Sequence, residues 1–442
     1  MEQNLVELAR NAGIVGAGGA GFPTAVKLDA SCDTVIVNGA ECEPLLRVDQ
    51  QLMVVKAEEL LEALNAVVEH TGAKEGVIGL KKKYVPAINR LNSMISKYPK
   101  LRLFILENFY PAGDEQTLVY EVTGKSVPEG GIPLNVGALV MNVETLLNLH
   151  NMMEDGTPVT DSYITVTGAV RKPLTIKVPL GITATQAIDL AGGATVDEYT
   201  IINGGPMMGK IVSPDSFVTK TTKGYIVLPS DHKLIESKTR PVSRSIRDAA
   251  VACMQCSLCT EVCPRHRLGH NLEPHKLMRI AAYGGTLDRK ALATTAFLCC
   301  DCGLCQHACV MDLQPWKFNQ ELKRQMSAAG IKNPHHNSDV HAIRFADTHR
   351  FDVHRLIRRL GLDQYDVPAP LVPEKLDYTA VTIPLSQHIG APSVPVVQVG
   401  DTVSRGQLIG DIPEGKLGAK IFASIDGVVT DISGNQISIS AA

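Results

Sequence analysis

Residues 253–263 read CMQCSLCTEVC and residues 299–309 read CCDCGLCQHAC, so the pattern C-x2-C-x2-C-x3-C occurs twice. The two copies contain eight of the eleven cysteines in the chain. Three thiolates at three-residue spacing can surround one [4Fe–4S] cube only if the backbone coils tightly around it, and the fourth, more distant cysteine then ligates the other cube. The spacing therefore predicts two [4Fe–4S] clusters and the transfer of single electrons.

The same rule assigns the ligands of each cluster. Cluster 1 is predicted to be held by Cys253, Cys256, Cys259 and Cys309, and cluster 2 by Cys299, Cys302, Cys305 and Cys263. Two zinc sites are the alternative, but zinc would leave each run of four cysteines self-contained. Disulfides are disfavoured because no secretory signal precedes the runs. We expect the three remaining cysteines, Cys32, Cys42 and Cys300, to be free thiols.

Length and charge limit the class of protein. The chain has 442 residues, enough for three or four compact units of about 100–150 residues each. Its 43 basic and 46 acidic residues are well mixed, so the chain lacks the basic footprint of a nucleic-acid-binding protein. No apolar run reaches the roughly 18–20 residues of a membrane span, and Met1–Arg10 lacks the basic region of a signal peptide. We expect a soluble, cytoplasmic protein with no direct membrane span.

Changes of texture along the chain predict a multidomain protein. Apolar strands at Thr34–Asn38, Gly76–Leu80 and Leu101–Leu106 alternate with a helix over about 50–70, which favours a parallel sheet covered by helices. Strands of period two at 163–168 and 174–178, followed by a helix near 183–191, favour a small β-grasp unit. The predicted parts are an α/β domain (1–158), a β-grasp domain of the soluble ligand-binding type (159–235), a helical two-cluster ferredoxin-like domain (240–330), a connecting arm with one helix at 353–360 (331–375) and an all-β barrel-sandwich hybrid (376–442).

A glycine-rich loop, Gly16-Ala-Gly-Gly-Ala-Gly-Phe-Pro23, lies near the N-terminus. Glycines permit positive φ and let backbone N–H groups approach a phosphate, so the loop is a plausible nucleotide cradle. A tight packing turn explains the loop equally well. It is not the usual dinucleotide fingerprint, because no clear strand precedes it.

Three further polar segments follow in order. They are Asn38-Gly-Ala-Glu-Cys-Glu-Pro44, Gly113-Asp-Glu115 and Asn142-Val-Glu-Thr145. Together with the glycine-rich loop they resemble the NADH- and FMN-binding flavoprotein subunit of respiratory complex I. With Asn203-Gly-Gly-Pro-Met-Met-Gly209, the cysteine runs and Gln387-His-Ile-Gly390, the whole chain resembles the RnfC component of Rnf complexes. It is still more similar to the cobalamin reductases of propanediol-utilisation microcompartments, because the Gln-His-Ile-Gly module is C-terminal here.

The resemblance implies a set of cofactor-binding residues. The flavin phosphate and ring would be held by Gly16, Gly18, Gly19, Gly21, Phe22 and Lys27; the flavin lined by Asn38, Glu41 and Glu43; the flavin–nicotinamide face formed by Gly113, Asp114 and Glu115; and the phosphate end closed by Asn142 and Thr145. Glu115 is the candidate catalytic residue. Two positions depart from complex I, where an arginine stands in place of Ala17 and an asparagine in place of Met141. The structural alternatives are that Glu43 caps a turn and that Asn142 caps the following helix.

Two other features are expected to carry no cofactor. Five histidines between His335 and His354 have irregular spacing beside several arginines, which fits a solvated arm better than a metal site. The C-terminal module resembles biotinyl and lipoyl carriers, but Lys416 lacks their sequence setting, so we expect it to be unmodified.

The resemblance implies an NADH-dependent cobalamin reductase. Electrons would pass from NADH through FMN and two [4Fe–4S] clusters to cobalamin, for coenzyme recycling inside a bacterial microcompartment. The implied partners are a cobalamin adenosyltransferase and the shell proteins. The alternative is an electron-relay or docking subunit, either of an Rnf-type membrane complex or of a glycyl-radical-enzyme microcompartment.

Overall fold

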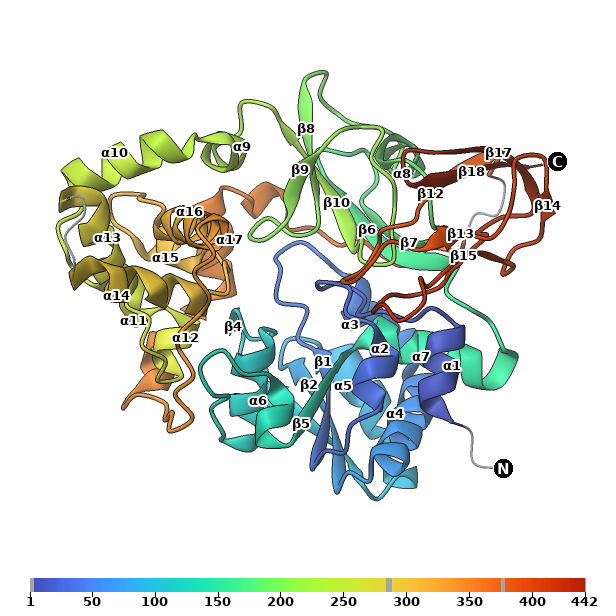
Figure 1. Ribbon diagram of the computed structural model, residues 1–442, viewed down its shortest axis with the longest axis horizontal. Coiled ribbons are helices and arrows are strands. Elements are labelled where there is room, and N and C mark those ends of the chain that lie inside the picture. The colour runs from blue at the N-terminus through green and yellow to red at the C-terminus, as the bar shows by residue number, and fades with distance from the viewer. Residues whose placement is uncertain (1–3, 284–287, 375–377, 442) are drawn as a thin grey trace.

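The computed structural model describes residues 4–283, 288–374 and 378–441, and it is a mixed α/β protein of several parts (Figure 1). The predicted boundary between residues 375 and 376 lies outside the described residues. None of the described helices combines the length and the apolar character needed to cross a membrane.

The N-terminal part is built on a four-stranded parallel sheet of order β3-β2-β1-β5. Its strands are apolar and buried on both faces, as parallel strands between helices require. The strands are β1 (Thr34–Gly39), β2 (Glu75–Lys81), β3 (Leu101–Leu106) and β5 (Ala138–Asn142). The helices are α1 (Leu5–Asn11), α2 (Thr24–Leu28), α3 (Val48–Val55), α4 (Ala57–Thr71), α5 (Val85–Asn92), α6 (Glu115–Thr123) and α7 (Val143–Asp155). The single helix expected over about 50–70 is two helices, because Lys56 leaves helical geometry at φ −122° and ψ 31°.

The second part is a five-stranded mixed sheet of order β7-β6-β10-β8-β9, in which β6 and β10 are parallel. Its elements are β6 (Asp161–Gly168), β7 (Leu174–Pro179), α8 (Ala184–Leu190), β8 (Tyr199–Asn203), β9 (Lys210–Val212) and β10 (Gly224–Pro229). Helix α8 begins where it was predicted because Thr183 and Gln186 cap each other's backbone N–H groups.

The third part is helical and contains both cysteine runs. Its helices are α9 (Lys233–Thr239), α10 (Val242–Ala252), α11 (Leu258–Glu261), α12 (Pro264–Arg267), α13 (Pro274–Tyr283), α14 (Asp288–Thr294), α15 (Leu304–Ala308) and α16 (Pro315–Ala328). The segment that follows includes β11 (Phe351–Asp352), which pairs with β4 (Phe109–Tyr110), and α17 (Val353–Leu360). The apolar face of α17 packs into a core shared with Leu234, Leu304 and Tyr110, so this segment ties the first part to the third.

The C-terminal part consists of two small sheets, β12-β18-β17-β14 and β13-β15-β16. Its strands are β12 (Ala380–Pro384), β13 (Val394–Pro395), β14 (Thr402–Val403), β15 (Leu408–Asp411), β16 (Ile421–Phe422), β17 (Gly427–Ser433) and β18 (Gln436–Ser440). Figure 1 shows these strands beside β6 and β7, on the opposite side of the molecule from the helical third part. One apolar core is continuous through the first, second and C-terminal parts.

Candidate functional site

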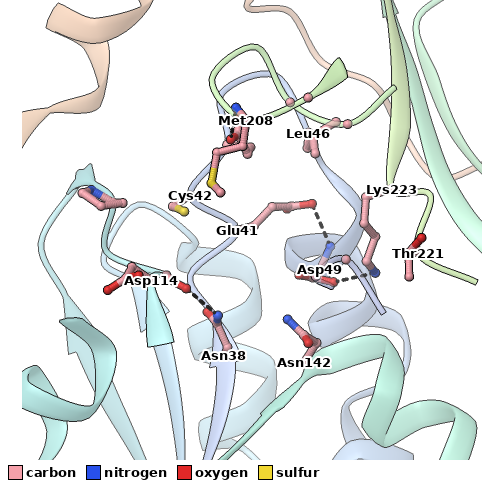
Figure 2. Close-up of a pocket in the computed structure, with 18 of the residues that line it drawn as sticks. Asn38, Glu41, Cys42, Leu46, Asp49, Asp114, Asn142, Met208, Thr221 and Lys223 are labelled. Atoms are coloured by element: carbon pink, nitrogen blue, oxygen red, sulfur yellow. Dashed lines mark hydrogen bonds and ion pairs between the residues drawn. The ribbon is translucent and has the colours of Figure 1, made fainter. Parts of the chain in front are cut away.

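A cavity of about 550 Å³, here called the central cavity, lies at the carboxyl ends of β1 and β5 (Figure 2). The chain runs from β1 outward to β2 and β3 and returns to place β5 on the other side of β1. Ligands of open α/β sheets bind where the strand order reverses in this way. The volume is in the range of ordinary small-molecule sites, about 300–1,000 Å³.

The central cavity brings together eight of the fourteen cofactor-binding residues predicted from the sequence. These are Gly18, Gly19, Asn38, Glu41, Glu43, Gly113, Asp114 and Asn142. Asn38 and Asn142 are register partners at the ends of β1 and β5. The Asn38 side-chain amide donates to the Gly113 carbonyl at 2.8 Å, which holds the 113–115 loop over the sheet end. Asn142 begins α7 without a side-chain capping bond, so its amide remains available to a ligand.

The glycine-rich loop forms one wall of the cavity. Gly16 N–H donates to the Phe22 carbonyl at 2.9 Å and closes the loop. Gly18 has φ +88°, and a Cβ there would lie 2.8 Å from Lys223 Cε. A Cβ on Gly19 would meet no protein atom within 4 Å. The loop therefore presents bare backbone to the cavity, which suits an anionic group such as a phosphate.

Two buried glutamates in the cavity wall bind backbone N–H groups. Glu41 accepts from Asp49 N–H at 3.1 Å and Gln50 N–H at 3.3 Å, which satisfies the first turn of α3. Burial, with the nearby charge of Asp49, raises the pKa of Glu41 to about 7. Glu43 accepts from the N–H groups of Met207 and Met208, both at 2.9 Å. Glu43 therefore caps a turn, as the structural alternative predicted, and that turn belongs to the second part of the chain.

Asp114 connects the central cavity to the helical part. Its carboxylate begins α6 by accepting from Thr117 N–H at 3.0 Å, and it receives two hydrogen bonds from Arg265, at 2.6 and 2.9 Å. Burial alone would raise the pKa of Asp114, but the Arg265 guanidinium outweighs burial and lowers it. Asp114 is thus already neutralised by a protein cation.

The other six predicted residues do not line the central cavity: Gly16, Gly21, Phe22, Lys27, Glu115 and Thr145. Thr145 Oγ1 accepts from Ala17 N–H at 2.9 Å and so supports the glycine-rich loop from behind. Lys27 donates to Glu115 Oε1 at 3.0 Å and to the Val140 carbonyl at 3.1 Å. Glu115, the catalytic candidate, therefore lies in a half-exposed ion pair.

The structure adds lining residues that the motifs did not indicate. Lys223 is buried and contacts Glu144, and its Nζ lies 3.2 Å from Asp49 Oδ1. Burial disfavours its charge, but Asp49 and Glu144 outweigh burial, and the pKa of Lys223 is raised. The loop 203–209 closes the cavity from the second part, although its sequence was noted only for the resemblance. Among the expected free thiols, Cys42 and Cys300 also line the cavity.

The two cysteine runs have the same backbone course, 46 positions apart. Gln255 and Ser257 in the first run have φ 59° and 64°, and Asp301 and Gly303 in the second have φ 56° and 75°. In each run the third cysteine lies in a short helix, α11 or α15. Left-handed residues at these positions curl the backbone as ligation of a cube requires.

The four cysteines assigned to cluster 1 line one common cavity, namely Cys253, Cys256, Cys259 and Cys309. Within the described ranges, no group of three His, Cys, Asp or Glu side chains is close enough to hold a single metal ion. A cube binds each thiolate to a different iron, so its cysteines stand farther apart than the ligands of one ion do. The arrangement fits a [4Fe–4S] cluster.

The cysteines assigned to cluster 2 adjoin the central cavity. Cys302, Cys305 and Cys263 are buried, and burial together with the nearby thiolates of Cys299, Cys259 and Cys263 raises the pKa of Cys305. Cys302 lines the central cavity. Its carbonyl accepts from the buried Tyr110 hydroxyl at 2.8 Å, which fixes the second run against the first part. A cofactor in the central cavity would therefore share a wall with cluster 2.

Four family models match successive parts of the chain. They are described as the Nuo51 FMN-binding domain (residues 9–151), the SLBB domain (163–210), a 4Fe-4S dicluster domain (252–314) and the RnfC barrel sandwich hybrid domain (372–441). The first covers the glycine-rich loop and the sheet, and the third covers both cysteine runs.

Curated relatives match over nearly the full length. The cobalamin reductase PduS of Citrobacter freundii is 43% identical over 441 residues, covering 99% of this chain and 96% of the relative. That of Salmonella typhimurium is 44% identical over 436 residues, covering 98% and 95%. A more distant relative, the RnfC-type component of the Na⁺-translocating ferredoxin:NAD⁺ oxidoreductase complex of Acetobacterium woodii, is 36% identical over 267 residues, covering 59% and 57%.

Proposed function

We propose that this chain, which belongs to the family of the PduS cobalamin reductases, reduces cobalamin with electrons from NADH by way of FMN and two [4Fe–4S] clusters. One observation carries the proposal. The cavity formed by the glycine-rich loop and the sheet ends is also lined by Cys302, an assigned ligand of cluster 2. The likeness to the PduS relatives spans the whole chain, whereas the match to the Rnf relative extends over 59% of it, so the reductase is favoured over an electron-relay protein.

Each group of residues has a separate role in this proposal. When bound, FMN accepts the two electrons of a hydride and the clusters carry electrons singly. The backbone of Gly18 and Gly19 receives the phosphate, and the amides of Asn38 and Asn142 orient the ring from the sheet ends. The capped carboxylates of Glu41 and Glu43 hold the surrounding loops closed and keep water out of the cavity.

Glu115 has an indirect role in this proposal. Its carboxylate pairs with Lys27, which also binds the Val140 carbonyl on strand β5. The pair links the start of α6 to the sheet and so positions the neighbouring Asp114. We assign Lys27 and Glu115 to positioning rather than to contact with the nicotinamide.

The division of the chain is part of the proposal. Residues 1–158, 159–235, 240–330, 331–375 and 376–442 form the five predicted parts, with the second a β-grasp unit. The mixed sheet with α8 packed on it supports that assignment. The fifth part is a barrel-sandwich hybrid whose Lys416 is unmodified.

Partners and location follow from the family. We place the chain in the cytoplasm inside a propanediol-utilisation microcompartment, beside its shell proteins. A cobalamin adenosyltransferase would consume the reduced cobalamin. The family membership supports both assignments.

Activity with two acceptors tests the function. Under anaerobic conditions the purified protein with NADH is expected to reduce cob(III)alamin. Cys256→Ser, which removes an assigned ligand of cluster 1, should slow cobalamin reduction more than NADH oxidation by an artificial acceptor that takes electrons directly from flavin. A parallel fall of both activities, or reduction of ferredoxin or flavodoxin without cobalamin, would favour the relay function instead.

A further inference from the structure

A second cavity, here called the basic cleft, lies beside cluster 1 and away from the central cavity. Its volume is about 460 Å³, and it is lined by residues of α9, α15 and α17 together with Cys309 and Val310. Four of its side chains are cations and one is a carboxylate: Lys233, Arg355, Arg358, Arg359 and Asp312. The cleft is therefore cationic and reaches an assigned ligand of cluster 1.

Helix α17 concentrates this charge. Positions 355, 358 and 359 lie on one face because they are spaced by three and four residues. The opposite face, formed by Val353, Leu356, Ile357 and Leu360, is buried. Like charges at i, i+4 repel each other, so an anion against this face would be stabilised.

The protein leaves most of the charge available. Arg359 donates to the carbonyls of His307 at 3.1 Å and Cys309 at 2.9 Å, which fixes its guanidinium without neutralising it. Arg358 is 80% exposed and only 3.7 Å from Asp363 Oδ1. Asp312, the cleft's carboxylate, is shared with Arg240 at 3.6 Å.

An apolar rim adjoins the basic cleft. Val310 is 60% exposed, Met311 46% and Met254 62%. All three also line the cavity formed by the thiols of cluster 1, and Val310 lines the basic cleft as well. The surface thus offers cations and apolar side chains within reach of one redox centre, which suits a ligand with an extended ring system and an attached anion.

We propose that the basic cleft and its rim bind cobalamin, with the phosphodiester of the nucleotide loop among the arginines and the corrin ring against Val310 and Met311. The inference rests on the proposed function, which identifies the acceptor. A whole cobalamin is larger than the cleft, so the cleft holds only its anionic end. Arginine is well suited to this role because its planar fork of N–H donors matches phosphate oxygens.

Binding to the holoprotein tests the site without relying on activity. The probes are cyanocobalamin, which carries the phosphodiester, and dicyanocobinamide, which lacks the nucleotide loop. In equilibrium dialysis, the double variant Arg355→Gln/Arg358→Gln should bind cyanocobalamin at least about tenfold more weakly, as expected for lost charge-assisted hydrogen bonds. Dicyanocobinamide should bind the double variant and the unmodified protein equally.

Arg90→Gln is the matched control, since Arg90 is an exposed helical arginine on α5, outside the cleft. It should leave both affinities unchanged, and all variants should keep their iron and flavin. Wild-type cyanocobalamin affinity in the double variant, or equal loss of both probes, would overturn the site while leaving cobalamin reduction intact as a function. Normal probe binding with slower reduction only when an adenosyltransferase is present would assign the cleft to an acidic protein surface instead.

Discussion

Neighbouring glycines of the N-terminal loop differ in what they do. Gly18 needs its positive φ and lies against the Lys223 side chain, whereas Gly19 faces open space in the central cavity. A side chain at Gly18 therefore strains the loop itself. A side chain at Gly19 takes only the space of a ligand.

Valine at position 19 should separate binding from folding. We expect Gly19→Val to lose FMN with little change in melting temperature, because the added atoms occupy the phosphate's place. Gly18→Ala should lower stability by about 1–2 kcal/mol through its left-handed backbone. Acid-released flavin per chain and thermal melting measure the two effects. Full flavin retention in Gly19→Val would move the phosphate site elsewhere.

Cysteines 263 and 300 should behave oppositely although both are near cluster 2. Cys263→Ser is expected to reduce the iron of the anaerobically purified protein from about eight to about four atoms per chain, because it removes a ligand of one cube. Cys300→Ser should keep about eight, since Cys300 is outside the ligand pattern. Iron analysis and electron paramagnetic resonance of the reduced proteins decide the matter. Loss of a cluster in Cys300→Ser would reassign the ligands.

The junction of α6 and α12 depends on one buried ion pair. Arg265 and Asp114 are both largely buried and form two hydrogen bonds across the boundary between the first and third parts. Removing one partner of such a pair leaves a buried charge uncompensated. The junction holds cluster 2 beside the central cavity.

Arg265→Met should therefore destabilise the protein by about 3–5 kcal/mol, seen as a lower melting temperature. Adding Asp114→Asn to that variant should recover much of the loss, because no unpaired charge remains. Arg102→Met, which breaks the exposed pair with Glu75, is the control and should cost less than about 1 kcal/mol. An equally small effect of Arg265→Met would mean that the pair does not hold the junction.

Three parts of the molecule meet at one buried lysine. Lys220, in the second part, donates to the Gly13 carbonyl of the first part at 2.7 Å and to the Lys420 carbonyl of the C-terminal part at 2.6 Å. Burial lowers the pKa of Lys220 to about 7. The C-terminal part is thus attached by a side chain that must lose its proton to be buried at low cost.

This lysine should make stability depend on pH. Between about pH 7 and the ordinary lysine pKa of 10.5, the unfolded chain binds a proton that the folded chain lacks, so stability rises with pH. Lys220→Met should remove that contribution, and the melting temperatures of the variant and the unmodified protein should diverge as pH rises from 7 to 9. The exposed Lys416→Met serves as control and should keep the pH slope. Parallel profiles for Lys220→Met and the unmodified protein would refute the assignment.

Much of the fold could be predicted because its signals are local. Strand Leu101–Leu106 and helix Val353–Leu360 lie where apolar period placed them, and the parallel sheet follows from the alternation of strands and helices. The break at Lys56 was missed, because the apolar period continues through it. The eight cavity residues lie within short motifs at strand ends or in a glycine-rich loop, where local sequence is informative.

What the sequence by itself determined is the cluster chemistry and the nucleotide loop, since metal ligation and phosphate cradles impose spacings on neighbouring residues. Only the tertiary structure decided that Lys223 and the 203–209 loop close the central cavity and that Asp114 pairs with Arg265. The same holds for the basic face of α17, which reads as a solvated arm in sequence but lies beside cluster 1. Such contacts join residues more than a hundred positions apart, or depend on how one helix docks. No periodicity or spacing encodes them, because they arise from the packing of whole domains.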